Sequence, residues 1–222
     1  LPGDYGIGKL GDKARLFVDF LAASGQKYWQ ILPLSPTGYG DSPYQSCCCN
    51  AGNPYFIDFE TLEADGLLEP SEYKNTVFGD NPSYINYGML YKTVSPRLRI
   101  AYSRFKPDYG MEEFARKNSD WVQDYALFMA LKDENKGKPW YEWSEPLRMA
   151  EQEALACARE RLKEDIGFYI FTQYEFYRQW FALKEYANKK AVELIGDMPI
   201  YCGYESVEVW LHPELLELDS KK

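Results

Sequence analysis

The spacing of apolar residues along the chain predicts one long helix with a regular aromatic stripe. Positions that recur at intervals of three and four residues indicate one face of a helix, and this pattern predicts a helix over residues 165–188. The members of the stripe are Tyr169, Gln173, Phe176, Trp180, Leu183 and Ala187. A periodic stripe of this kind belongs to the core about four times more often than to a ligand platform, so we assign these side chains to the core.

Weaker patterns predict shorter helices on either side. Apolar positions favour helices over residues 12–24, 59–65, 120–132 and 151–162. The segment 69–117 is rich in Tyr, Pro and Lys without a clear period, so we expect it to be irregular.

Two short apolar runs predict buried strands. Residues 28–32 form the first run, which Pro33 ends, and residues 192–195 form the second, which Gly196 and Asp197 follow. The order strand, loop, helices, strand indicates an α/β fold. A right-handed crossover between the runs would make them neighbouring, parallel strands.

The segment directly after the first run, PLSPTGYGDSPYQSCCCNAGNP over residues 33–54, has the most informative composition. It displays Tyr39, Asp41 and Tyr44 among glycines and prolines, which fix an unusual backbone path. Aromatic and carboxylate side chains on such a path bind a ligand about as often as they belong to a rigid surface loop. Both interpretations remain open on composition alone.

Charge and cysteine usage narrow the possible partners. The formal net charge of the 222 residues is −9, which argues against nucleic acid and anionic membranes as partners and suits a neutral substrate. With no targeting segment and no apolar stretch of membrane-spanning length, we expect a cytoplasmic protein. We expect no metal and no cofactor, because there is one histidine, His212, and no Cys-x-x-Cys spacing. The cysteines expected to be free thiols are Cys47, Cys48, Cys49, Cys157 and Cys202.

Several literal motifs add a family resemblance. They are YGIGKLGD at 5–12, KYWQILPL at 27–34, GYGDSPYQS at 38–46, AGNP at 51–54, GKPWYEW at 137–143, QWFALKEYAN at 179–188, GDMPIY at 196–201, VW at 209–210 and LELD at 216–219. In this order they resemble the N-terminal portion of the 4-α-glucanotransferases, also called amylomaltases or disproportionating enzymes. The resemblance implies a partial (β/α)8 TIM barrel with an inserted, mostly helical or irregular subdomain. Residues 1–66 would be a barrel portion with a glucan-binding loop, 67–164 the insertion, and 165–222 a truncated barrel portion.

The same resemblance implies a function and a set of substrate-binding residues. The family transfers a 1,4-α-glucan segment to the 4-hydroxyl of a glucan or glucose by a retaining double displacement. Tyr44 and Asp197 match residues at the donor sugar, and Tyr39 matches an aromatic residue that binds longer glucan. Asp41 and Ser42 lie between the two tyrosines, and the resemblance supports them less strongly as substrate-binding residues. Without the resemblance, we would favour a role of Asp197 in turning the chain over a role in binding a ligand by about two to one.

The residues that carry the family's chemistry are missing from this chain. Retaining transfer needs a carboxylate nucleophile and an acid/base carboxyl group about 5–5.5 Å apart. The family places its nucleophile in an Arg-x-Asp-His motif, and His212, between Leu211 and Pro213, does not fit it. We therefore expect a fragment without catalytic residues, inactive alone. Two alternatives stay open, namely a non-catalytic glucan- or partner-binding module and a fragment of an α-amylase-clan hydrolase.

Three departures from the family pattern stand out. The family usually has apolar or small residues where residues 47–50 read CCCN, and an apolar pair where Cys202 and Gly203 stand. It often has Asp where this chain has Glu205, which places that residue in doubt as a sugar contact. The cysteine triplet suggests no chemistry by itself.

Overall fold

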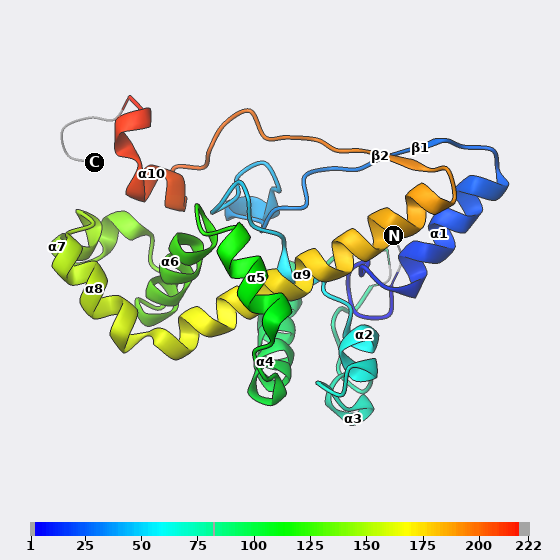
Figure 1. Cartoon of the computed structure of the whole chain (residues 1–222), viewed down its shortest axis with the longest axis horizontal. Coiled ribbons are helices and arrows are strands. Elements are labelled where there is room, and N and C mark those ends of the chain that lie inside the picture. Colours follow the sequence, from blue (N-terminus) through cyan, green and yellow to red (C-terminus); the bar gives the residue numbers. More distant parts are fainter. Residues whose placement is uncertain (1–2, 82, 218–222) are drawn as a thin grey trace. The chain divides into compact units, whose positions relative to one another are not determined.

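The computed structural model describes residues 3–81 and 83–217, most of which lie in helices (Figure 1). The helices are α1 Asp12–Ala23, α2 Phe59–Ala64, α3 Pro70–Tyr73, α4 Tyr87–Arg104, α5 Tyr109–Lys117, α6 Val122–Glu134, α7 Glu145–Arg148, α8 Gln152–Arg161, α9 Lys163–Lys189 and α10 Val207–Leu211. The strands are β1 Tyr28–Gln30 and β2 Glu193–Ile195. Two compact units are present: the first holds residues 1–34, 52–108 and 174–197, and the second holds 35–51, 109–173 and 198–222.

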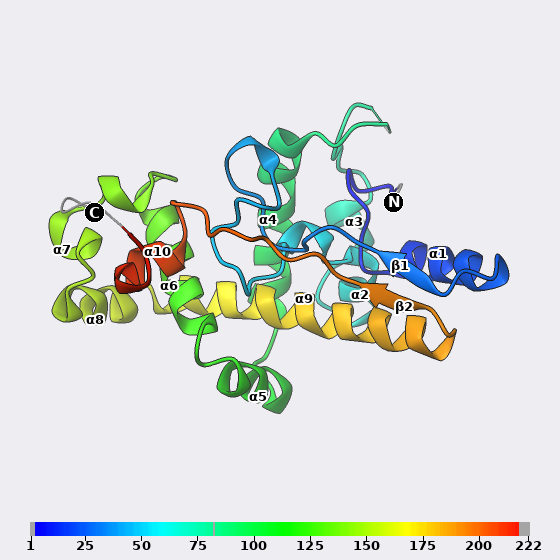
Figure 2. The ribbon, with the colours of Figure 1, turned by 90° about the horizontal axis from the view of Figure 1, so that it is seen from above.

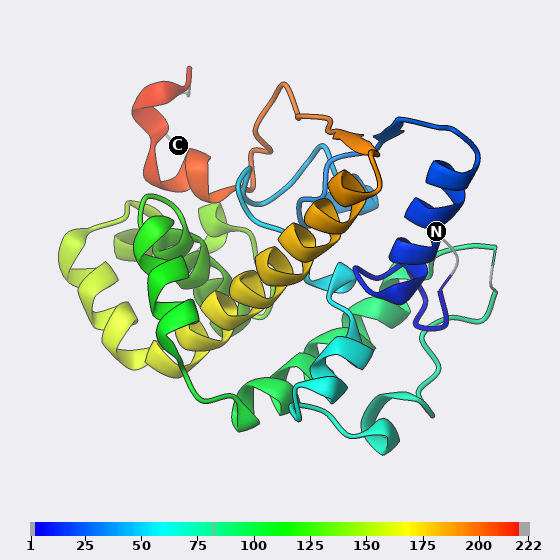
Figure 3. The same cartoon turned by 45° about the vertical axis from the view of Figure 1, so that its right-hand side comes forward.

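The two strands of the first unit are parallel neighbours, so the predicted pairing is confirmed. Their register joins Trp29 to Leu194, and Figure 3 shows the strands side by side. Each strand has three residues, fewer than predicted. The second starts late because the Val192 N–H donates to the Ala187 carbonyl oxygen (3.0 Å), so Val192 closes the end of α9 instead of joining the sheet.

The predicted long helix is α9, which leads through a tight turn into β2 (Figure 2). Its predicted stripe is buried, except for Trp180, which is half-buried. Near its C-terminal end the Tyr186 hydroxyl donates to Asp19 of α1 (2.8 Å), and Lys190 forms an ion pair with the same carboxylate (2.8 Å). These contacts fix α1 against the end of α9 and thereby support the two strands.

The expectation that residues 69–117 are irregular is wrong, because this segment contains α3, α4 and α5. Helix α4 buries Leu90, Val94 and Leu98, which lie four residues apart on one face. The Asn86 side chain caps it by accepting a hydrogen bond from the Met89 N–H (3.1 Å). Pro96 within the helix and the surrounding tyrosines hid this pattern in the sequence.

The core of the second unit contains a cluster of aromatic rings around Trp210. Helices α6, α7, α8 and α10 pack together there (Figure 3). The fully buried Trp210 of α10 lies 5.3 Å from Trp143 and 5.7 Å from Phe128, measured between ring centroids. Its indole N–H donates to the Leu147 carbonyl oxygen (2.8 Å), so the ring is held on both its apolar and its polar sides. Among the helices described, none is long and apolar enough to cross a membrane.

Candidate functional site

The two ends of the loop over residues 35–51 are held together at its base. The Asn53 N–H donates to the Leu34 carbonyl oxygen (2.8 Å), which joins the two ends of the loop. Gly52 is required beside this junction, because a β-carbon there would lie 1.9 Å from the Phe176 ring of α9. The AGNP motif therefore has a structural role, which is to close the base of the loop against α9.

The tip of the loop has the unusual backbone path that its composition predicts. Gly40 and Asp41 both have positive φ angles, 72° and 59°. A β-carbon on Gly38 would lie 1.9 Å from the Gln45 carbonyl oxygen, so only glycine fits. The Ser42 hydroxyl accepts a hydrogen bond from the Tyr44 N–H (3.3 Å).

This turn displays the candidate residues on the surface of the second unit. The Tyr44 side chain is 43% exposed, Asp41 is exposed and Ser42 is half-buried. The Tyr39 side chain lies outside the described part of the structure, as do the last two residues of the LELD motif. The structure thus brings Asp41, Ser42 and Tyr44 together on one turn.

The end of the loop is fastened to α10. The Ser46 hydroxyl donates to the Cys48 carbonyl oxygen (2.8 Å), and the buried Cys48 anchors this turn. The Val207 N–H donates to the Cys47 carbonyl oxygen (2.9 Å), and the Cys49 N–H donates to Oε1 of Glu208 (2.7 Å). Sequence reasoning missed these links, because the partners are far apart in the chain and no local pattern joins them.

Glu205, which stands where the family often has Asp, forms an ion pair with Lys132 of α6. Both side chains are partly buried in the second unit. This pairing gives Glu205 a structural role in holding the segment before α10 against α6.

Asp197 is exposed in the first unit, two residues beyond the end of β2. Because β1 and β2 are parallel, the segments that follow them leave the same edge of the sheet. In open and closed parallel sheets this edge carries the binding site. Asp197 belongs to the first unit and the tyrosine loop to the second, so the structure does not bring all the candidate residues into one unit.

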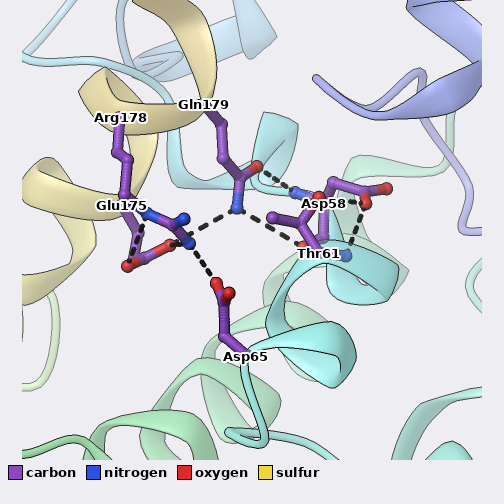
Figure 4. Close-up of polar contacts among 6 residues, drawn as sticks. All are labelled: Asp58, Thr61, Asp65, Glu175, Arg178 and Gln179. Carbon is purple, nitrogen blue, oxygen red and sulfur yellow. Dashed lines mark hydrogen bonds and ion pairs between the residues drawn. The ribbon is translucent and has the colours of Figure 1, made fainter. Parts of the chain in front are cut away.

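A polar network fixes the helix that leads to Asp197 (Figure 4). The Gln179 side chain of α9 accepts a hydrogen bond from the Asp58 N–H (2.7 Å). Asp58 in turn caps α2, because its carboxylate accepts from both the N–H and the hydroxyl of Thr61 (2.8 Å each). The network therefore joins α9 to the start of α2.

An ion pair between the partly exposed Arg178 and the buried Glu175 continues this network along α9. Arg178 pairs with Glu175 (2.7 Å) and also with Asp65, just past the end of α2 (Figure 4). The Glu175 side chain is 2% exposed, and burial raises its pKa while the Arg178 guanidinium opposes that shift. Glu175 and Gln179 are four residues apart beside an aromatic stripe, and this spacing was the signal in the sequence that could have revealed the network.

Lys9 is a buried base that sequence reasoning did not single out. Its ammonium group donates to the Tyr55 carbonyl oxygen (2.6 Å) and lies 4.3 Å from the centroid of the Phe59 ring. Burial lowers the pKa of Lys9 to about 7, although the negative charge of Asp58 opposes this shift.

The stability of the first unit should therefore depend on pH through Lys9. Between pH 7 and the ordinary lysine pKa of about 10.4, the unfolded chain holds a proton that the folded chain lacks, so stability rises with pH. We expect the free energy of unfolding of the wild type, relative to Lys9→Met, to rise on the order of 1 kcal/mol per pH unit between pH 7 and pH 9. Urea unfolding at several pH values measures this, with the exposed Lys13→Met as control, and a constant or falling difference for Lys9→Met contradicts it.

No group of three or more His, Cys, Asp or Glu residues that could hold a metal ion occurs in residues 3–81 and 83–217. The five cysteines have free thiols in this structure. The turn of residues 38–45 offers a ligand the aromatic ring and hydroxyl of Tyr44, the hydroxyl of Ser42 and the carboxylate of Asp41.

Comparison with known proteins identifies the family. The family model described as 4-alpha-glucanotransferase matches residues 1–222. The chain belongs to the 4-alpha-glucanotransferase family. The 4-alpha-glucanotransferase of Clostridium butyricum is 45% identical over 100% of this chain and 46% of that protein. The enzyme of the same name from Thermus thermophilus is 45% identical over 100% of this chain and 44% of its own length.

Solved structures of the family extend the comparison. The amylomaltase of Streptococcus agalactiae in complex with acarbose matches with a TM-score of 0.96 and 45% identity, over 100% of this chain and 46% of that one. The amylomaltase of Corynebacterium glutamicum matches with a TM-score of 0.70 at 16% identity, over 92% of this chain and 29% of that one, which shows a shared fold alone. The α/β fold class and the family resemblance of the motifs are thus confirmed. The chain spans less than half the length of these relatives.

Proposed function

We propose that this chain is the N-terminal, glucan-binding part of a 4-α-glucanotransferase. The whole enzyme would move a 1,4-α-glucan segment of a maltodextrin, starch or glycogen chain to the 4-hydroxyl of another glucan or of glucose. The observation that carries the proposal is the match to the S. agalactiae amylomaltase, which extends over 100% of this chain with a TM-score of 0.96. That protein was solved with acarbose bound, which supports a maltooligosaccharide as the ligand.

The fold proposed with this function is a partial (β/α)8 barrel. Strands β1 and β2 would be two adjacent barrel strands, since they are parallel and a long helical segment lies between them. Residues 1–66 and 165–222 would supply barrel portions, and residues 67–164 the inserted subdomain. The edge of the sheet that Asp197 follows would then be the face on which barrel enzymes bind substrate.

The residues of this chain would bind the substrate without carrying out the bond exchange. The exposed ring of Tyr44 suits the C–H face of a sugar, and the Asp197 carboxylate suits the hydroxyl groups of the same donor sugar. Tyr39 would contact glucan further from the reacting bond, and Asp41 and Ser42 could add hydrogen bonds from the same turn. The nucleophile and the acid/base, which a retaining transfer needs, would come from residues outside this chain.

A chimeric enzyme tests this proposal. In the chimera, this chain replaces the matched 46% of the S. agalactiae amylomaltase. We expect the chimera to bind acarbose and to convert maltotriose into glucose and longer maltodextrins. A chimera that unfolds cooperatively but neither binds acarbose nor converts maltotriose contradicts the proposal.

Replacing Asp197 in the chimera should impair every donor. We expect Asp197→Ala to lower kcat/KM for maltotriose and for long glucans alike, by about 10- to 200-fold. This range corresponds to the loss of a hydrogen bond to a charged group, about 1.5–3 kcal/mol, that strengthens in the transition state. Steady-state kinetics with both donors measures the effect, and the exposed Asp120→Ala is the matched control. Unchanged kinetics would mean that Asp197 only turns the chain and does not contact the substrate.

Replacing Tyr39 in the chimera should distinguish donors by length. We expect Tyr39→Ala to spare maltotriose turnover and to weaken the use of long glucans by about 2- to 10-fold, the size of one aromatic contact. The contact is remote from the reacting bond, so short donors do not reach it. Competition between maltotriose and amylose measures this preference, with the exposed Tyr109→Ala as control. Equal losses for both donors would instead place Tyr39 at the donor sugar.

A further inference from the structure

Two of the five cysteines meet in the second unit. The sulfur atoms of Cys49 and Cys202 lie 3.5 Å apart, although the residues are 153 positions apart in the sequence. This distance is close to van der Waals contact between two sulfur atoms, and both residues are exposed to solvent.

The surrounding backbone brings these thiols together. The Cys49 N–H donates to Oε1 of Glu208 (2.7 Å), and the Val207 N–H donates to the Cys47 carbonyl oxygen (2.9 Å). Beside Cys202, the position of a β-carbon on Gly203 lies 3.1 Å from the Ser46 carbonyl oxygen. The two segments are therefore packed in place, with the sulfur atoms 3.5 Å apart, and they must approach to about 2.05 Å to form a bond.

We propose that Cys49 and Cys202 form a site of reversible oxidation, at which a small-molecule disulfide closes a bond between them. This bond fastens the tyrosine-bearing loop, residues 35–51, to the segment that leads into α10. It adds a covalent link where hydrogen bonds already hold the loop.

The exchange occurs in two balanced steps. The thiolate of Cys202 attacks one sulfur of the small disulfide, which forms a mixed disulfide and releases one small-molecule thiol. The thiolate of Cys49 then attacks the Cys202 sulfur, closes the protein disulfide and releases the second thiol. Two protein protons leave with the two small-molecule thiols, and the small disulfide is the species that is reduced.

The surroundings of Cys49 disfavour it as the first nucleophile. Burial, Glu208 and Cys202 raise the pKa of the Cys49 thiol to about 12, so this thiol is rarely a thiolate at neutral pH. The neighbouring thiols are poorer candidates. Cys48 is fully buried, and the thiol of the half-buried Cys47 lies 3.9 Å from Sδ of Met129. Cys157 is exposed on α8 and provides a matched control.

Oxidised glutathione is the probe for the test. After incubation of the folded protein, thiol titration and peptide mapping should find two of the five thiols lost, in one Cys49–Cys202 peptide that dithiothreitol reverses. Cys157→Ser should lose two thiols as well. Cys49→Ser should accumulate a glutathione adduct on Cys202, and Cys202→Ser should leave Cys49 reduced. Retention of all five wild-type thiols, a stable glutathione adduct on the wild type, or a bond between other cysteines overturns the proposal.

The covalent link also has a stability readout. Because the bond joins residues 153 positions apart, it restrains the unfolded chain strongly. We expect the melting temperature of the oxidised wild type to exceed that of the reduced form by at least about 4 °C, and no such gain in Cys49→Ser or Cys202→Ser. An oxidised wild type that melts no higher than the reduced form contradicts the proposed fastening.

Discussion

The 222-residue chain by itself is expected to convert maltotriose at a rate at least about 10⁶-fold below that of the chimera. The reason is that the sequence contains no Arg-x-Asp-His motif and its single histidine, His212, lies in a Leu-His-Pro context. Loss of a catalytic nucleophile typically leaves only the small contributions of binding and electrostatics. Chromatographic detection of glucose and maltodextrins, with chain and chimera at equal concentration, measures the difference.

The control for this experiment is the folded state of the chain. Cooperative thermal unfolding of the isolated chain shows that the absence of turnover is not a failure to fold. Formation of glucose and longer maltodextrins by the isolated chain at about 1 s⁻¹ or faster refutes the prediction. In that case the nucleophile must be sought among Asp41, Asp197 and Glu205.

Replacing Trp210 by alanine is expected to lower the free energy of unfolding by about 3–5 kcal/mol. Trp210 is fully buried, contacts the rings of Trp143 and Phe128, and donates its indole N–H to the Leu147 carbonyl oxygen. Alanine leaves a cavity among these rings and removes one of the two hydrogen bonds that the Leu147 carbonyl oxygen accepts, the other coming from the Ala150 N–H. Urea unfolding followed by circular dichroism measures the loss.

Two further variants bracket this effect. Trp210→Phe keeps an aromatic ring but loses the hydrogen bond to Leu147, so it should cost less than Trp210→Ala. Tyr109→Ala removes a ring that is 77% exposed and should change stability by about 0.5 kcal/mol or less. A loss for Trp210→Ala that is no larger than the loss for Tyr109→Ala contradicts the assigned core.

The parts of the fold that could be predicted are those with a strong local signal. The stripe from Tyr169 to Ala187 predicted α9 within two residues at its start and one at its end, because its period extends over several turns. The parallel pairing of β1 and β2 followed from chain order and crossover geometry. Helix α4 was missed because Pro96 and the tyrosines obscured its buried face, although Asn86 was an available capping signal.

The candidate site was predictable only in part, for a physical reason. The glycines and prolines predicted the constrained turn on which Tyr44 is displayed, and the positive φ angles of Gly40 and Asp41 agree. The fastening of this loop to Glu208 and the thiol pair depend on tertiary packing between distant segments, which leaves no local pattern. Lys9 was missed for the same reason, since its burial depends on the Phe59 ring and the Tyr55 carbonyl.

The central claim is that this chain is part of an enzyme that transfers glucan segments rather than hydrolysing them. The most direct measurement follows maltotriose conversion by the chimera and counts total reducing ends together with glucose and longer maltodextrins. Transfer to a sugar hydroxyl makes one glycosidic bond for each bond broken, so we predict that products accumulate while the number of reducing ends stays constant. A steady increase in reducing ends contradicts the account in favour of a hydrolase, and acarbose binding without any products contradicts it in favour of a binding module.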